Sequence, residues 1–206
     1  MVRASRMHVV GQWTSVLMIA AGVFIPVIAS AEERWVALSP KETSVTFKLE
    51  ATGHEVNGVL PVQSGRIQFE PGSRTVSGEV TIDARRAVTG NRLRDRQMHD
   101  EVLESERFPL IVFRPDRVTG TLPSSGTSDI TIHGVVSMHG ADHAVTLPAR
   151  VTQSSDRIRA EMTFDIPYVD WGLRNPSFLF LRVARVVTVT VKLEGDVRPA
   201  AGPARP

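Results

Sequence analysis

After residue 31, apolar and polar residues alternate along much of the chain. Between residues 43 and 49, Val45, Phe47 and Leu49 alternate with serine, threonine and lysine. Side chains of a β-strand point alternately to its two faces, so this period of two predicts strands with one buried face. The other runs with this period contain Val80 and Ile82; Ile111 and Phe113; Ile130 and Ile132; Val145 and Leu147; Ile158, Ala160, Met162, Phe164 and Ile166; and Val187, Val189, Val191 and Leu193.

Short turns separate these runs. Turn-forming residues occur at residues 71–72, Gly120, Gly126, Gly140 and residues 154–156. Because the connections are short, neighbouring strands are expected to be antiparallel. About eight strands at this spacing predict a meander that closes into a β-barrel, since closure removes the exposed edges of the sheet.

One segment breaks the period of two and predicts the single helix, over about residues 91–104. Thr89 or Asn91 can cap its start, and Asp95 lies in the first turn, where a carboxylate suits the positive end of the helix dipole. We expect this helix to pack at one end of the barrel.

A second irregular segment spans residues 168–184. It carries Trp171, Phe178, Phe180 and Leu181 among glycine, proline and arginine residues. So many large apolar side chains in a connection predict that the segment folds over another part of the protein.

The N-terminus has the order of features that a signal peptidase recognises. Arg3 and Arg6 precede an uncharged, mainly apolar stretch over residues 11–28, and an A-x-A triplet ends at Ala31. A membrane anchor is the alternative, but polar residues, glycine and proline interrupt the stretch of about 20 apolar residues that a spanning helix needs. We therefore expect a cleavable signal peptide over residues 1–31.

The remaining chain is expected to form one domain, residues 32–197, followed by a disordered proline- and glycine-rich tail, residues 198–206. Removing Arg3 and Arg6 from the 24 basic residues leaves 22, against 22 acidic ones. The exported protein is then nearly neutral, so a nucleic-acid partner is not expected. The lack of cysteine excludes disulfides, thiol catalysis and cysteine metal sites.

Two groups of residues could carry chemistry. His133, His139 and His143 with Asp142 could bind zinc or copper, but their spacing fits no standard motif and surface histidines are the preferred interpretation. No nucleophile-elbow, zinc-protease or phosphate-loop motif is present, so an enzyme is not expected.

The second group is a cluster of arginines that could clamp an anionic headgroup, because guanidinium groups hold phosphate or carboxylate with paired hydrogen bonds. The alternative is a solvated helix face paired with Asp83, Asp95 and Glu101. The members of the cluster are Arg85, Arg86, Arg92, Arg94 and Arg96.

Three segments together resemble the YceI family: residues 43–60, 89–113 and 132–147. In the second segment the resemblance lies in Thr89, Gly90, Arg94, Asp95, Phe108, Pro109 and Phe113. In the third it lies in Gly134, Met138, His139, Gly140, Val145 and Leu147.

The resemblance implies an exported, eight-stranded antiparallel lipocalin-like β-barrel with an elongated apolar cavity that binds a polyisoprenoid or another long-chain lipid. It implies sequestration or carriage in the periplasm, without catalysis, cofactor or metal. The alternatives are a filled barrel that acts as a structural or protein-interaction module of the cell envelope, and a metal-dependent enzyme. Transient contact with a membrane surface and a homodimer are further partner hypotheses. The residues expected to contact the lipid are Phe47, Leu49, Ile82, Leu93, Met98, Phe113, Ile132, Phe164, Trp171, Phe178, Val189 and Arg94.

Overall fold

The computed structural model describes residues 33–70 and 73–199. The predicted signal peptide and residues 200–206 of the predicted tail lie outside this range. Arg198 and Pro199, which we assigned to the tail, instead belong to the last strand, where they pair with Trp35 and Arg34. A membrane-spanning helix, long and apolar enough to cross a bilayer, is not found among the described residues.

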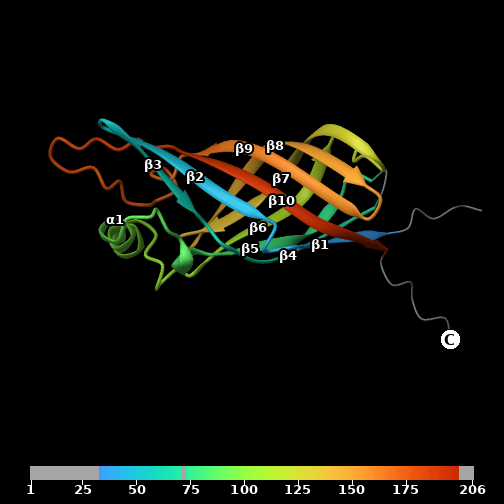
Figure 1. Cartoon of the computed structure of the whole chain (residues 1–206), viewed down its shortest axis with the longest axis horizontal. Coiled ribbons are helices and arrows are strands. Elements are labelled where there is room, and N and C mark those ends of the chain that lie inside the picture. Colours follow the sequence, from blue (N-terminus) through green and yellow to red (C-terminus); the bar gives the residue numbers. More distant parts are fainter. Residues whose placement is uncertain (1–32, 71–72, 200–206) are drawn as a thin grey trace, which may run out of the picture. The chain divides into compact units, whose positions relative to one another are not determined.

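Ten strands form one antiparallel sheet that curves round on itself (Figure 1). The long strands β7 and β8 form a hairpin, and β9 and β10 are joined by a 20-residue connection, residues 167–186. The strands are β1 (Arg34–Leu38), β2 (Ser44–Ala51), β3 (His54–Val59), β4 (Val62–Phe69), β5 (Val76–Asp83), β6 (Leu110–Thr119), β7 (Gly126–Met138), β8 (Ala141–Ser154), β9 (Arg157–Ile166) and β10 (Val187–Pro199).

The ten strands occupy eight positions around the barrel. One half of β10 pairs with β1 and the other half with β2, so β1 and β2 share one position. In the same way β3 and β4 share the next position, since β3 pairs with β2 and β4 with β1. Pairing of β10 with β1 closes the sheet. The predicted eight-stranded antiparallel barrel is therefore confirmed.

Two interruptions account for the extra strands. Between β1 and β2, the backbone N–H groups of Glu42 and Thr43 both donate to the carbonyl of Ser39, which makes a turn. Between β3 and β4 stands Pro61, which has no N–H group to donate to a neighbouring strand. Apolar residues continue to alternate on both sides of each break, so the sequence pattern does not indicate that a strand ends there.

The alternation in the sequence correctly predicted which residues of the strands face the interior of the barrel. Alternate residues of β9, from Ile158 to Met162, are buried, whereas Arg159 and Glu161 between them are exposed. Val189 of β10 and Val45 of β2 join the same core. Burial of these side chains on one face stabilises the barrel by removing apolar surface from water.

Gly134 of β7 lies where β6 is irregular. The pairing of β6 with β7 shifts between Pro115 and Arg117, which brings the β6 backbone close to β7. A Cβ atom at Gly134 would overlap the Arg114 carbonyl oxygen and lie 2.8 Å from the Cα of Pro115. Only glycine fits this position without displacing the backbone of β6.

The predicted helix exists, as α1 (Arg92–Gln97) followed by a π-helical turn, η2 (Met98–Val102). Asn91 caps its start and accepts hydrogen bonds from the backbone N–H groups of Leu93 and Arg94, each at 3.1 Å. Thr89 instead donates from its backbone and its hydroxyl to Asp95 Oδ1, at 2.7 and 2.6 Å. The helix lies at the end of the barrel reached by the β2–β3 hairpin (Figure 1).

Candidate functional site

The interior of the barrel encloses an apolar cavity of about 350 Å³, which all ten strands help to line. This volume lies within the range of pockets that hold small molecules, about 300–1,000 Å³. The strand residues on its wall are almost all valine, leucine, isoleucine, phenylalanine, methionine and alanine. A barrel filled by its own side chains would leave no such space, so the interior is suited to holding an apolar ligand.

Nine of the twelve residues expected to contact a ligand lie on the wall of this cavity. Most of them come from strands whose alternation was visible in the sequence, while Met98 and Arg94 come from the helical segment. The nine are Phe47, Leu49, Ile82, Arg94, Met98, Phe113, Ile132, Phe164 and Val189.

The other three residues expected to contact the ligand, Leu93, Trp171 and Phe178, do not line the cavity. Leu93 is 76% exposed on α1, and Phe178 is 70% exposed in the loop after β9. The Trp171 ring stacks on His143, with centroids 4.1 Å apart and planes 3° from parallel. All three lie in irregular segments, where no period of two indicates which side chains face inward.

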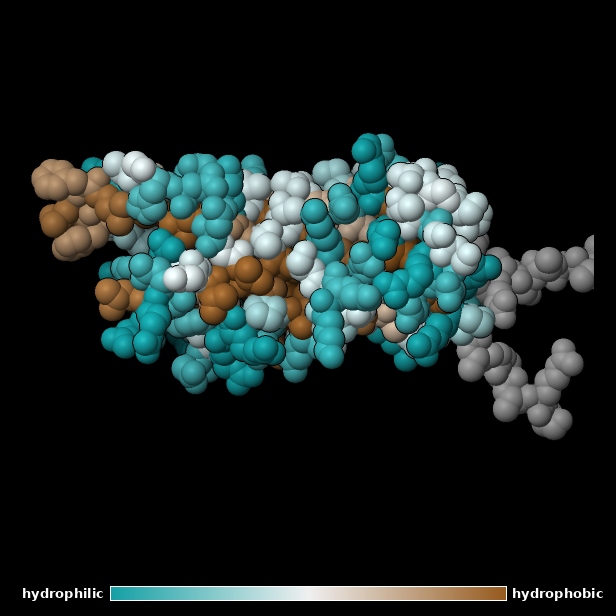
Figure 2. Space-filling model, viewed as in Figure 1, coloured by the Kyte–Doolittle hydropathy of each residue, from teal (hydrophilic) through white to brown (hydrophobic). Residues whose placement is uncertain are grey.

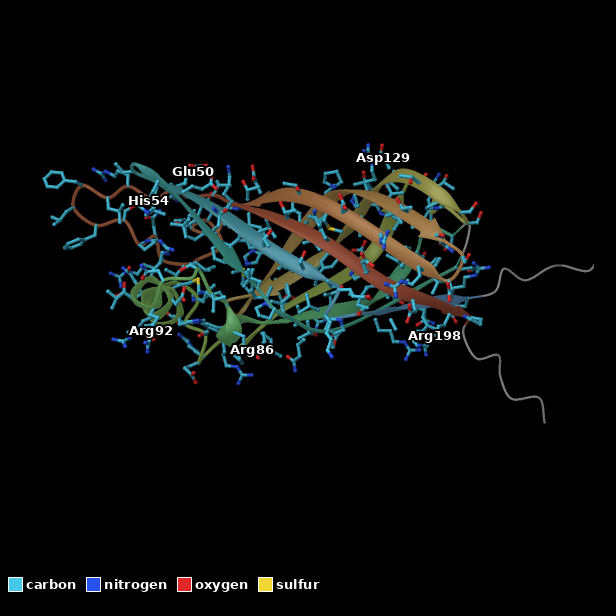
Figure 3. The ribbon with its side chains drawn as sticks, viewed as in Figure 1. Glu50, His54, Arg86, Arg92, Asp129 and Arg198 are labelled. Atoms are coloured by element: carbon cyan, nitrogen blue, oxygen red, sulfur yellow. The ribbon has the colours of Figure 1, made fainter. Side chains whose placement is uncertain are left out.

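Polar side chains gather at one end of the cavity, which we call the mouth. They come from β3, from the helical segment and from the residues after β9. Figure 3 places His54 at the same end of the barrel as Arg92 of α1, with Arg198 toward the other end. The polar residues of the mouth are His54, Thr89, Arg94, Gln97 and Tyr168.

The sequence had indicated only two of these five, Arg94 as a ligand-binding residue and Thr89 as a helix cap. His54, Gln97 and Tyr168 are isolated polar residues in the sequence, and no motif surrounds them. The mouth therefore emerges from the fold rather than from any local pattern.

The arginine cluster divides into separate roles. Arg94 lines the mouth, where its Nε donates to the Thr89 hydroxyl at 2.8 Å and its Nη2 to the Thr89 carbonyl at 3.1 Å. No carboxylate in the described part of the chain comes within ion-pair distance of Arg94. Arg85 instead binds Asp83 at 3.1 Å, and this hydrogen bond lowers the pKa of the Asp83 carboxyl. The remaining members, Arg86, Arg92 and Arg96, are exposed.

The connection between β9 and β10, residues 167–186, forms one wall of the mouth, and we call it the rim loop. Leu173, Leu181 and Val183 line the cavity, so this part of the segment folds over the mouth of the barrel. Phe178 and Phe180, on which the prediction of a folded-over segment also rested, are instead exposed. Hydrogen bonds hold its base to the β2–β3 hairpin, with Thr52 N–H donating to the Arg182 carbonyl at 2.9 Å. On the other side, Arg174 pairs with Glu101 of η2 at 3.2 Å.

Tyr168 anchors the base of the rim loop, and we predict a pH-dependent contribution to stability. Its hydroxyl donates to the Ala184 carbonyl at 2.8 Å, and burial raises the pKa of the phenol above its usual 10.0. The raised pKa means that the folded state holds the proton more tightly. The stabilisation is therefore complete below pH 10.0 and is lost as pH rises through the folded-state pKa.

The variant Tyr168→Phe is expected to lose about 1 kcal/mol of unfolding free energy at neutral pH. The Ala184 carbonyl then loses its shorter hydrogen bond and keeps only the one from Asn175 Nδ2, at 3.5 Å. Urea unfolding at neutral and alkaline pH measures this difference, which should shrink as pH rises. Equal stability of the two proteins at neutral pH would show that the hydrogen bond contributes nothing.

The three histidines weighed as metal ligands have separate partners. His133 contacts the hydroxyls of Thr119 and Thr146 at 3.1 and 3.2 Å. His139 lies beside the Phe108 ring, with centroids 4.4 Å apart, and His143 stacks on Trp171. No cluster of three or more potential metal-ligating side chains occurs in residues 33–70 or 73–199.

The chain is similar in structure to several solved proteins. A polyisoprenoid-binding domain from Saccharophagus degradans, implicated in plant cell wall breakdown, is 16% identical and superposes with a TM-score of 0.65, over 79% of this chain and 98% of that domain. BcnA from Burkholderia cenocepacia is 15% identical, with a TM-score of 0.62, over 76% and 98% of the two chains. The Campylobacter jejuni YceI protein is 16% identical, with a TM-score of 0.52, over 68% and 84%.

A comparison with curated proteins found no match. The family model for the YceI-like domain matches residues 36–195, which run from β1 to β10 and include the helical segment, the rim loop and every strand that lines the cavity. The chain therefore belongs to the YceI-like domain family.

Proposed function

We propose that the barrel binds one long-chain, polyisoprenoid-like lipid, with the apolar chain in the cavity and the headgroup at the mouth. The observation that carries this proposal is the distribution of polarity, since the cavity wall is apolar except at one end. An amphiphile with one polar end and a long apolar chain matches that distribution. Similarity to a polyisoprenoid-binding domain supports the same class of ligand.

Binding of this kind needs no chemistry. Each CH₂ group removed from water contributes roughly 0.8 kcal/mol, so a long chain can be held by burial alone. The barrel would then sequester or carry a lipid through water between membranes. Export to the periplasm, transient contact with a membrane surface and a homodimer stay predictions.

The proposal is tested by identifying what the protein carries. Protein recovered from the exported fraction of its host is extracted with organic solvent, and the extract is examined by mass spectrometry. A prenyl or other long-chain lipid in the extract is the expected result. No extractable lipid, together with no binding of added prenyl lipid, would contradict the proposal.

Binding of added lipid needs a reporter inside the cavity. Trp35 and Trp171 do not line the cavity, and Trp35 lies beside the guanidinium groups of Arg66 and Arg198, at 4.3 and 5.4 Å. Phe113 does line it, so the variant Phe113→Trp places an indole ring in the cavity. Its fluorescence should change on titration with a prenyl lipid, whereas that of the unaltered protein should change little.

Arg94 is expected to bind an anionic headgroup. In Arg94→Gln, affinity for a long-chain prenyl phosphate should fall roughly tenfold to a hundredfold, the range of a charge-assisted hydrogen bond. Affinity for the corresponding uncharged prenol should stay within a factor of about two, because burial of the chain is unchanged. Titration of the Phe113→Trp reporter with both lipids measures this.

Arg92→Gln is the matched control, since Arg92 lies on the same helix but does not line the cavity. It should bind both lipids as the unaltered protein does. Equal losses in the Arg92 and Arg94 variants, or equal losses for both lipids, would contradict a headgroup role for Arg94.

A further inference from the structure

The tip of the rim loop exposes a group of large apolar side chains. We call residues 178–181 the tip; Phe178, Leu179 and Phe180 are 70%, 71% and 91% exposed. Figure 2 shows the hydrophobic surface of this loop projecting beyond the surrounding polar surface at the mouth end of the barrel. Contiguous exposed apolar residues are uncommon on proteins that face only water, and they mark contact surfaces.

The tip is an ordered turn. Phe178 and Leu181 exchange backbone hydrogen bonds, at 3.1 and 2.9 Å, and so place Leu179 and Phe180 at the apex. Leu179 has a φ of +49°, a left-handed backbone conformation that favours glycine or asparagine and is strained for leucine. The turn thus carries large apolar side chains where a small or polar residue would be less strained.

The base of the tip is held firmly. Ser177 Oγ accepts a hydrogen bond from the Val183 N–H at 2.9 Å, and Asn175 Nδ2 donates to the Val183 carbonyl at 3.1 Å. Leu181 lines the cavity while its neighbour Phe180 projects into solvent. The exposed tip is therefore continuous with the wall of the mouth.

Basic residues surround the mouth on both sides. The rim loop contains three arginines and one carboxylate, and residues 84–102 contain five arginines and three carboxylates. Arg92, Arg96 and Arg182 are exposed, and within the described ranges none of them forms an ion pair. On α1, exposed Leu93 follows Arg92 directly. Apolar side chains flanked by unpaired cations complement the interface of a membrane that contains anionic lipids.

We propose that the tip of the rim loop and Leu93 insert into the outer layer of an anionic phospholipid membrane and seat the cavity mouth against it. A lipid chain could then pass between bilayer and cavity without crossing open water. This inference rests on the proposed lipid-binding function for its purpose, but the contact itself does not require a bound lipid.

The test measures binding to vesicles by co-sedimentation, with protein from the exported fraction whose N-terminus is established by intact mass. Vesicles contain equal parts of phosphatidylcholine and phosphatidylglycerol, or phosphatidylcholine alone. The double variant Leu179→Ser, Phe180→Ser should bind the anionic vesicles at least roughly tenfold more weakly than the unaltered protein. Arg182→Gln should weaken binding to anionic vesicles roughly fivefold and leave binding to neutral vesicles unchanged.

Two further variants guard against indirect effects. Phe180→Trp keeps a large apolar side chain at the tip, so it should retain binding and shift its fluorescence to shorter wavelength on anionic vesicles. Arg74→Gln removes an exposed arginine that precedes β5, at the end of that strand remote from η1 and α1. It should bind vesicles as the unaltered protein does.

Two results would overturn the inference: an unaltered protein that does not bind anionic vesicles, or a tip variant that binds as well as the unaltered protein. If the tip variant instead abolishes self-association in sedimentation velocity, with no vesicle binding by either protein, the tip is an interface between two copies of this chain and the inference is also wrong.

The inference and the proposed function fail in different ways. The tip variant should still bind added prenyl lipid as the unaltered protein does, because Leu179 and Phe180 do not line the cavity. Extractable lipid without vesicle binding would contradict membrane docking alone. Vesicle binding without any extractable or added lipid in the cavity would contradict the lipid-binding function alone.

Discussion

Ala160→Trp should remove binding of the longest lipid chains while leaving the barrel folded. Ala160 lines the cavity from β9 and pairs with Val151 and Leu193, which line it from the two neighbouring strands. An indole ring here would occupy space that the lipid chain needs. If about three CH₂ groups are excluded at roughly 0.8 kcal/mol each, affinity falls roughly fiftyfold. Titration with prenyl lipids of increasing length measures the loss, which should grow with chain length.

The control for this variant is Ala149→Trp, on the adjacent strand β8. Ala149 belongs to the buried core but does not line the cavity. The same added volume must therefore displace packed side chains, which is expected to cost about 1–3 kcal/mol of unfolding free energy. If Ala160→Trp is destabilised as much as Ala149→Trp and binds lipid normally, the interior is a packed core and not a binding cavity.

Gly134→Ala is expected to have the largest effect on stability, about 2–4 kcal/mol, because its Cβ would overlap the backbone of β6. A backbone held in a sheet on both sides cannot move away as a side chain can. Urea unfolding of the variant and the unaltered protein measures this loss. The irregular pairing at Pro115 and Arg117 is what makes glycine necessary here.

Gly58→Ala is the matched comparison, because this glycine also lies in a strand with ordinary φ and also lacks room for a Cβ. There the obstructing atoms belong to the ring of Phe47, a cavity-lining side chain that can swing into empty space. Gly58→Ala should therefore lose less unfolding free energy than Gly134→Ala. Equal losses would show that backbone crowding at Gly134 is not the cause.

The strands could be predicted because their alternation reports directly which residues face the interior. Phe47, Phe113 and Phe164 lie on the cavity wall, as the period of two placed them. Turn residues then predicted short connections and hence antiparallel neighbouring strands. The number of strands predicted that the sheet closes into a barrel. The sequence did not predict that two of the eight barrel positions are each occupied by two short strands, β1 and β2 in one and β3 and β4 in the other. The turn and the proline that separate these strands do not disturb the apolar pattern.

The ends of the barrel were harder to predict. Leu93 and Met98 are both apolar residues of the helical segment, yet Met98 lines the cavity and Leu93 faces solvent. Trp171 lies against His143, a contact between segments distant in the sequence. Where no regular period exists, the direction of a side chain depends on tertiary contacts that the sequence does not display. His54 and Tyr168 are brought to the mouth by such contacts.

Native mass spectrometry of protein purified from its host tests the central claim most directly. The account predicts a complex with one long-chain lipid per chain, which organic extraction reduces to the mass of the protein alone, and which added prenyl lipid restores. Ala160→Trp should show loss of the longest lipids under the same conditions. A protein that carries no lipid and takes up none when prenyl lipid is added would contradict the account.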